Sequence, residues 1–289
     1  MARGDGVGAA RVPAIPLCLS VGVTGHRDLG DADGAIAARL GDILHRLHAA
    51  GSALAGSACF APAPLVARLV CPLAAGADQI AAAAALAQGY ALHAVLPFGR
   101  DDYRADFAPE AAAAFTGLIT RAKRVLELSC GRGDVAAYAL AGRATVAHCD
   151  VLIAVWDGLP KRGAGGTAEI VEVALRRGVP VIHVPLIAAT PVRLLWSAHE
   201  PHLAPTQIDE IVARPLDATG YDALVAALLA PPAGSVEAAH LAAFRAETAR
   251  RFTPRIKYPL LLALTGVRWL RRSALILAPF AMRTSGTAI

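Results

Sequence analysis

Cysteines, charged residues and aromatic rings are all scarce in this chain: it has five cysteines among 289 residues, 18 % charged and 5 % aromatic residues. No two cysteines have the CxxC spacing of a zinc or redox motif, and an odd, scattered set of thiols is typical of a reducing cytoplasm. GxSxG, HExxH and GxxxxGK[ST] motifs are missing as well. A nucleophile-elbow hydrolase, a zinc protease and a P-loop ATPase therefore have no support. We expect a cytoplasmic protein without a metal site or a cofactor.

Acidic residues are missing from the C-terminal segment, residues 250–289, which carries eight Lys and Arg side chains. The formal net charge of the whole chain is only +5, so the first 249 residues have a net charge of −3. The pI of 9.2 thus does not indicate a core that binds nucleic acid. Any anionic partner suggested by bulk charge belongs to the C-terminal segment.

The N-terminus has the order of a secretory signal, because Arg3 and Arg11 accompany an apolar stretch over residues 12–23. Pro13 and Pro16 would break the helical part of such a signal, and a polar TGHR sequence follows where a cleavage site should be. We therefore expect a flexible lead-in over residues 1–16 and a strand after it.

The rest of the chain alternates apolar runs with segments of helical periodicity. The mean hydropathy of +0.48 owes much to 66 alanines, which favour helices without requiring lipid. Residues 51–64 are expected to form a loop and residues 100–107 an irregular segment. The predicted strands are residues 17–23, 65–73, 90–96, 125–128, 151–156 and 179–184, with an edge strand near 192–196. The predicted helices lie near residues 33–47, 77–88, 109–122, 134–148, 167–177 and 221–229.

Six strands separated by helices predict an α/β fold with an open, doubly wound, mostly parallel sheet of the Rossmann-like kind. This domain is expected to span residues 17–230. Pro231-Pro232-Ala233-Gly234 has the composition of a linker. Residues 231–289 would then be a helical extension that is both basic and apolar.

Polar or glycine-containing clusters follow the predicted strands, at residues 24–27, 76–78, 97–106, 131–134 and 157–167. Ligands of open parallel sheets bind beyond the carboxyl ends of the strands, where helix N-termini converge. We therefore predict one binding site built from five loops. The alternative is that these residues serve only as turns and helix caps.

The strongest cluster is Gly163-Ala164-Gly165-Gly166-Thr167, which stands between a buried strand and a helix. Glycines let backbone N–H groups approach an anion closely, and the Thr167 hydroxyl can donate to a phosphate oxygen. The cluster predicts a phosphate site. A flexible loop with Thr167 as a helix cap is the alternative.

Other residues beside these loops suit a charged ligand. Arg27 can pair with a phosphate, and His26 can bind a ribose or a base edge. Asp157 and Glu169 can accept hydrogen bonds from sugar hydroxyls or act as bases. Asp78 is expected to be a helix N-cap rather than a contact. The candidate ligand-binding residues are Thr24, Gly25, His26, Arg27, Gly76, Asp78, Asp157, Gly158, Gly165, Gly166, Thr167 and Glu169.

One further loop carries Tyr103, Asp106 and Phe107. We expect this loop to be packed against the domain, and the alternative is that it folds over a bound base.

Six segments occur in a fixed order: VGVTGHRDL, LAAGADQIAAAAALAQGY, LPFGRDDYRADF, AYALAGRATVAHCDVLIAVWDG, GAGGTAEI and VPVIHV. Over residues 17 to about 185 this combination resembles the SLOG superfamily, the Rossmann-like relatives of the LOG phosphoribohydrolases and of the DNA-uptake protein DprA. The resemblance implies a nucleotide or nucleotide-derived ligand. Several such proteins are thought to be sensors of signalling nucleotides in bacterial conflict systems, and some carry a membrane-associated effector region after the Rossmann domain.

The enzymatic branch of that superfamily is matched less well. LOG enzymes carry PGGxGTxxE, and alignment on Thr167 puts Ala164 at a glycine position and Ile170 at the glutamate position. Glu169 is one residue away, which on a helix is a rotation of about 100°. Their catalytic arginine lies on the preceding helix, where this chain has Arg143 at a slightly different offset.

We therefore expect a nucleotide-ligand sensor that holds a phosphate on the N–H groups of residues 165–167, with Arg27 as counter-charge and Asp157 toward the ribose. The alternative is a LOG-like hydrolase of the N-glycosidic bond of nucleoside monophosphates. Glu169 or Asp157 would then activate water, while Arg27 or Arg143 holds the phosphate.

Within the extension, residues 254–282 contain two apolar runs, 259–267 and 274–282, separated by Arg268, Arg271 and Arg272. A membrane-spanning helix needs about 20 apolar residues, and three central arginines would cost several kcal/mol, so we do not expect it to span a bilayer. Two expectations remain. The segment packs on the Rossmann-like domain or on a second subunit, or it lies on an anionic membrane surface.

Overall fold

The computed structural model describes residues 15–56, 60–132, 134–160, 165–196 and 213–230. All of them belong to one folded unit, Ile15–Ala230. The predictions for the N-terminal lead-in up to residue 14, for the linker and for the extension over residues 231–289 lie outside the described residues.

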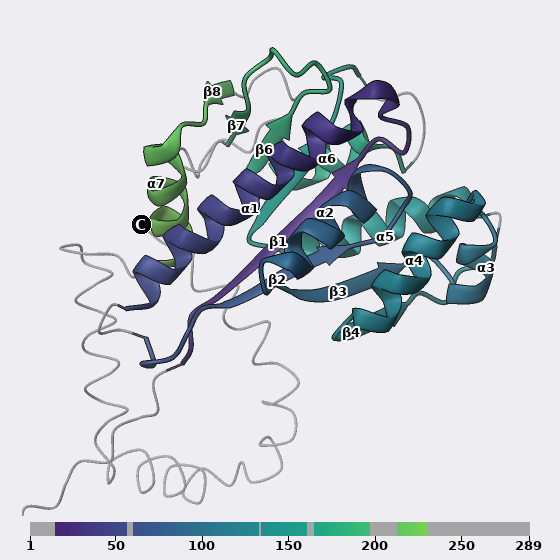
Figure 1. Cartoon of the computed structure of the whole chain (residues 1–289), viewed down its shortest axis with the longest axis horizontal. Coiled ribbons are helices and arrows are strands. Elements are labelled where there is room, and N and C mark those ends of the chain that lie inside the picture. Colours follow the sequence, from purple (N-terminus) through teal and green to yellow (C-terminus); the bar gives the residue numbers. More distant parts are fainter. Residues whose placement is uncertain (1–14, 57–59, 133, 161–164, 197–212, 231–289) are drawn as a thin grey trace, which may run out of the picture. The chain divides into compact units, whose positions relative to one another are not determined.

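The strands of the described residues form one eight-stranded sheet (Figure 1). They are β1 (Cys18–Gly25), β2 (Val66–Cys71), β3 (Ala91–Leu96), β4 (Arg124–Glu127), β5 (Val151–Val155), β6 (Val181–Val184), β7 (Arg193–Leu195) and β8 (Ala213–Pro215). Their order is β4-β3-β2-β1-β5-β6-β7-β8. β1 to β6 pair in parallel, whereas β7 and β8 are antiparallel to their neighbours. The predicted α/β fold with a mostly parallel sheet is confirmed.

Helices cover both faces of this sheet. They are α1 (Asp33–Ala55), α2 (Ala77–Ala87), α3 (Arg100–Arg104), α4 (Pro109–Arg121), α5 (Val135–Ala147), α6 (Thr167–Arg176) and α7 (Ala218–Leu229), and a short 3-10 helix, η1 (Gly30–Ala32), precedes α1. α1 lies beside α2 and α7 (Figure 1), whereas α5 contacts α6.

The central strand β5 is buried on both faces, and its side chains alternate between two parts of the core. Val151, Ile153 and Val155 pack into the core that contains the apolar face of α1 and α2. Leu152 and Ala154 pack into the core that contains α6. A strand covered on both sides has no solvated face, which explains why its sequence is continuously apolar.

Two local predictions were wrong, and one strand was missed. Residues 51–64 do not begin as a loop, because α1 continues to Ala55 and buries Ala50, Gly51 and Ala55. The missing side chain of Gly51 makes room for Leu65, so here glycine marks a close contact rather than a turn. The irregular segment after Gly99 begins with the short helix α3. Strand β8 had no sequence signal, because it has three exposed residues.

The chain reverses its direction of travel through the sheet between β1 and β5. The strands β2, β3 and β4 lie on one side of β1, and the chain then crosses through α5 to β5 on the other side. The last paired residues of these two strands are Gly25 and Val155. A crevice beyond such a switch point is where open α/β sheets bind ligands.

Replacing Gly25 with alanine is expected to destabilise the fold. A Cβ atom there would lie 2.4 Å from the Cβ of Ala77 and 2.9 Å from the Cβ of Val155, and neither atom is the end of a flexible side chain. Overpacking of this kind costs about 1–3 kcal/mol or more. Urea unfolding followed by circular dichroism should report the loss.

The control is Gly34→Ala, because no atom lies within 4 Å of a Cβ at Gly34 in α1. Alanine is a better helix former than glycine, so this change should raise the free energy of unfolding by up to about 1 kcal/mol. Equal stabilities of the two variants would contradict the close approach at Gly25.

Candidate functional site

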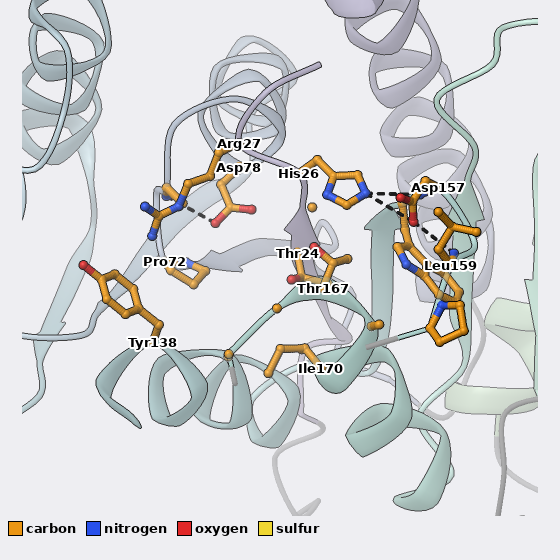
Figure 2. A pocket seen from close by; sticks show the side chains of 18 of the residues that line it. Thr24, His26, Arg27, Pro72, Asp78, Tyr138, Asp157, Leu159, Thr167 and Ile170 are labelled. Atoms are coloured by element: carbon orange, nitrogen blue, oxygen red, sulfur yellow. Dashed lines mark hydrogen bonds and ion pairs between the residues drawn. The ribbon is translucent and has the colours of Figure 1, made fainter. Parts of the chain in front are cut away.

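A cavity of about 370 Å³ lies at the switch point, beyond the carboxyl ends of β1, β2 and β5 (Figure 2). We call it the switch-point cavity. Its lining residues are Thr24, Gly25, His26, Arg27, Pro72, Ala74, Asp78, Tyr103, Tyr138, Gly142, Trp156, Asp157, Leu159, Pro160, Gly165, Gly166, Thr167, Ala168 and Ile170. Four of the five predicted loop clusters therefore contribute to one cavity.

Most of the candidate ligand-binding residues line this cavity. They are Thr24, Gly25, His26, Arg27, Asp78, Asp157, Gly165, Gly166 and Thr167. Gly76, Gly158 and Glu169 are not among its lining residues. The structure thus brings together the loops after β1 and β5 and the N-termini of α2 and α6. Three of the candidates lie outside the cavity lining.

Gly76 has a backbone role. Its φ is +79°, and a Cβ atom there would lie 2.3 Å from the carbonyl oxygen of Arg27 and 2.7 Å from that of His26. The next residue, Ala77, donates its N–H to the same His26 oxygen over 3.2 Å. Gly76 therefore lets α2 start against the loop after β1. Gly158 likewise occupies a left-handed turn, with φ +82°.

The first turn of α6 opens on the cavity. Its N-cap is Gly166, whose residue type offers no side chain to accept hydrogen bonds, and Gly166, Thr167 and Ala168 all line the cavity. The first N–H groups of a helix have no partner within the helix and carry its positive dipole end. This end of the cavity can therefore bind an anion.

Glu169 is turned to the loop that precedes α6. One carboxylate oxygen accepts a 2.8 Å hydrogen bond from the N–H of Gly165, and the other lies 3.6 Å from the Arg143 guanidinium. Only 12 % of the side chain is exposed. Ile170, at the position of the LOG glutamate, is buried and packs where Gly142 leaves room for it.

Asp78 is a buried carboxyl group in the first turn of α2. The predicted N-cap role was wrong, because Gly76 is the N-cap and Asp78 follows it by two positions. One oxygen, Oδ2, accepts from the N–H of Ala74 over 3.2 Å. Burial raises the pKa of Asp78 to about 7, although the Ala74 hydrogen bond and the Arg27 charge both act to lower it.

The turn before α2 has a strained backbone and carries the N–H that binds this carboxyl group. Leu73 is a buried residue with φ +60°, a conformation that costs non-glycine residues about 1–3 kcal/mol. Its carbonyl oxygen accepts from the Gln79 side chain over 3.3 Å. The turn brings the N–H of Ala74 to Asp78.

Arg27 lies over the ring of Tyr138, with its guanidinium carbon 5.0 Å from the ring centroid. Tyr138 in turn donates to Asp106 over 2.9 Å, and Arg132 pairs with the same carboxylate at 3.0 Å. A chain of contacts from α5 and from the loop after α3 thus orients Arg27 at one end of the cavity (Figure 2). Asp106 orients a cavity residue and does not itself line the cavity.

His26 and Asp157 face each other across the switch point (Figure 2). The Nε2 atom of His26 accepts from the N–H of Asp157 over 3.3 Å and lies 3.5 Å from its carboxylate. Both side chains are partly exposed, so a ligand can reach them.

From the sequence, Tyr103 was expected in a packed loop rather than in the binding site, and Tyr138 was not identified. Tyr103 packs edge-on against Phe98, Phe107 and Phe115, which confirms that its segment is packed, yet it also lines the cavity. The signal was present in the aromatic residues of LPFGRDDYRADF, but only the folded chain shows which ring faces the site.

Within the described residues, no three His, Cys, Asp or Glu side chains are grouped as a metal ion would require. The same residues contain no helix with the length and apolar character needed to cross a bilayer.

No model of a known protein family matches the sequence, and no curated protein is significantly similar to it. Among solved structures, DprA from Streptococcus pneumoniae is 20 % identical with a TM-score of 0.38, over 58 % of this chain and 50 % of that chain. DprA from Helicobacter pylori, described for its single-stranded DNA binding mode, is 16 % identical with a TM-score of 0.37, over 59 % of this chain and 66 % of that chain.

A third structure, that of the protein TM1055, is 16 % identical with a TM-score of 0.32, over 57 % of this chain and 72 % of that chain. The match spans half of the first DprA chain and just under two thirds of the second. At 16–20 % identity and TM-scores of 0.32–0.38, these similarities concern the fold alone.

The buried carboxyl group of Asp78 should make stability depend on pH. Its pKa is about 7 in the folded chain and about 3.9 in an unfolded one, so between these values the folded chain holds an extra proton. The free energy of unfolding therefore falls as the pH rises from 4 to 7. Relative to Asp78→Asn, which keeps an oxygen for the Ala74 N–H, the wild type should lose stability on the order of 4 kcal/mol across that range.

Urea unfolding of both proteins at half-unit pH steps measures this difference. Cys71 and Tyr103 interact electrostatically with Asp78, and burial raises the pKa values of the Cys71 thiol and the Tyr103 phenol, so neither of these two groups titrates between pH 4 and 7. A stability difference that stays constant with pH would show that Asp78 has an ordinary pKa.

Proposed function

We propose that the switch-point cavity binds a phosphorylated, nucleotide-derived small molecule and that the domain acts as its sensor. The observation that carries the proposal is the N-terminus of α6, which opens on the cavity without a side-chain cap. A phosphate placed there would meet backbone N–H groups and the positive end of a helix dipole. Arg27 lines the same cavity and supplies a full positive charge.

The two helices that begin at this cavity differ in what their N-termini accept. α2 carries its own carboxyl group, Asp78, in its first turn. α6 has Thr167 and Ala168 at the equivalent place, and the one acid of its first turn, Glu169, is engaged with Gly165 and Arg143. An incoming anion would be repelled by an ionised Asp78, so the phosphate is assigned to α6.

Part of the cavity lining is apolar, which suits a nucleotide base. Trp156, Leu159, Pro160 and Ile170 line the cavity together with the His26–Asp157 pair. A few directed polar groups in an otherwise apolar cleft are typical of small-molecule sites. Asp157 and His26 are placed to meet sugar or base donors and acceptors, which supports a nucleotide rather than a simple oxyanion.

The contacts of Glu169 favour binding over hydrolysis. A general base must reach the attacking water, whereas this carboxylate accepts from a backbone N–H, pairs with Arg143 and does not line the cavity. We therefore expect no release of free base from nucleoside monophosphates. The negative net charge of the first 249 residues likewise supports a small-molecule ligand rather than nucleic acid at this domain.

Gly166→Asp tests the phosphate assignment. Aspartate is a favourable N-cap residue, and Gly166 has φ −76° and ψ 161°, which any residue adopts, so the fold should keep its stability. Its carboxylate would accept from the N–H groups of the first turn and repel a phosphate. We expect at least a tenfold loss of affinity for the nucleoside monophosphate that binds the wild type most tightly, measured by calorimetry over a panel of them.

Gly34→Asp adds the same charge to α1, away from the cavity, and should leave that affinity unchanged. Bound ligand at 100 times its dissociation constant should stabilise the wild type by about 2.7 kcal/mol, which gives an independent thermal readout. Full affinity in Gly166→Asp would refute binding of phosphate at α6.

A further inference from the structure

The hydroxyl group of Tyr103 has no hydrogen-bond partner in the part of the chain that the structure describes, although the side chain is 1 % exposed. Its ring is fixed by edge contacts to Phe98, Phe107 and Phe115 at centroid distances of 4.7–5.7 Å. Because Tyr103 lines the switch-point cavity, this unpartnered donor belongs to the site. Leaving a buried hydroxyl unpaired costs about 1–3 kcal/mol.

Asp78 lines the same cavity as this hydroxyl. After burial, the Asp78 charge is the largest cause that raises the pKa of Tyr103. Oδ2 of Asp78 is engaged by the N–H of Ala74, whereas Oδ1 has no hydrogen-bond partner among the described residues. Figure 2 shows the carboxyl group directed into the space that it shares with Arg27 and Thr24. One acceptor on a buried side chain and one buried donor thus line the same cavity.

Few ligand groups satisfy both atoms. A hydroxyl group donates to the carboxylate and accepts from the tyrosine, so it completes both hydrogen bonds. A phosphate accepts from Tyr103 but brings its charge against Asp78, and an ammonium group offers no acceptor and lies close to the Arg27 charge. A base is less suited to this place, because Arg27 covers one face of Tyr138 and phenylalanines pack edge-on against Tyr103.

We infer that Asp78 and Tyr103 form a subsite for a sugar hydroxyl, so that the ligand is a sugar phosphate or a nucleotide bound through its ribose. The inference rests on the proposed function for the position of the phosphate at α6. It assigns the ligand two anchors, which are the phosphate at Thr167 and a hydroxyl at Asp78. A ligand that lacks the hydroxyl leaves two buried groups unpaired and binds more weakly.

The test compares ribose 5-phosphate with inorganic phosphate on the full chain, by calorimetry, in the wild type and in Tyr103→Phe. The variant loses one oxygen that has no partner in the unliganded protein, so its free energy of unfolding should stay the same or rise. Its affinity for ribose 5-phosphate should fall about tenfold, the effect of one hydrogen bond. Its affinity for inorganic phosphate should not change.

Tyr90→Phe is the matched control, because the Tyr90 hydroxyl is equally buried but donates to the carbonyl of Leu44, 2.7 Å away and outside the cavity. This variant should lose stability and keep both affinities. Asp78→Asn adds a second readout, since an amide can offer a donor where the sugar hydroxyl needs an acceptor, and it should also weaken ribose 5-phosphate selectively.

The outcomes separate the subsite from the proposed function. If the wild type binds ribose 5-phosphate no more tightly than inorganic phosphate, water fills the subsite and the inference is wrong while the phosphate site stands. If Tyr103→Phe keeps its full affinity for ribose 5-phosphate, the inference is likewise wrong. If neither compound binds the wild type, the proposed function fails together with the inference that rests on it.

Discussion

The site depends on the close approach of three backbone segments at the switch point. Gly25 ends β1 against Val155 of β5 and Ala77 of α2, and Gly76 starts α2 against the carbonyl groups of His26 and Arg27. A Cβ atom at either glycine would lie within 2.4 Å of a neighbouring atom. Because no side chain fills these contacts, the loop after β1 lies close to the N-terminus of α2. The N-termini of α2 and α6 then contribute residues to one cavity.

The two helix N-termini then divide the cavity electrostatically. Asp78 in α2 is a carboxyl group whose pKa burial raises to about 7, so it makes its end neutral or negative depending on pH. The first turn of α6 carries no free acid into the cavity, since Glu169 is held by Gly165 and Arg143. Under the proposed function, α6 would hold the phosphate and α2 a neutral hydrogen-bonding group. Such a pair would discriminate between the two ends of an asymmetric ligand.

Much of this arrangement could be predicted from the sequence, because its signals are local. The strands are short apolar runs, the loops after them carry Gly, Asp and Thr, and parallel strands bring those loops to one edge. Side-chain directions were not accessible in this way. Glu169 is one residue from the LOG position, accepts from the N–H of Gly165 and is not itself a lining residue, while Gly76 packs against the carbonyl groups of His26 and Arg27. The first outcome depends on how the loop before α6 folds and on Arg143, and the second on a distant segment of the chain, and local sequence patterns do not report either.

The polar groups of the cavity destabilise the protein in the absence of a ligand, which supports the proposed function. The unpaired Tyr103 hydroxyl and the left-handed backbone of Leu73 each cost about 1–3 kcal/mol, and the buried Asp78 costs on the order of 4 kcal/mol at pH 7. The net stability of a typical domain is about 5–15 kcal/mol. The three features gather around one turn and one cavity rather than being scattered through the core. Packing alone would favour phenylalanine in place of Tyr103, an apolar residue in place of Asp78 and glycine in place of Leu73. In the proposed subsite, a bound hydroxyl would offset the costs at Tyr103 and Asp78 at once, because it would pair with the tyrosine and with the carboxyl group beside the turn at Leu73.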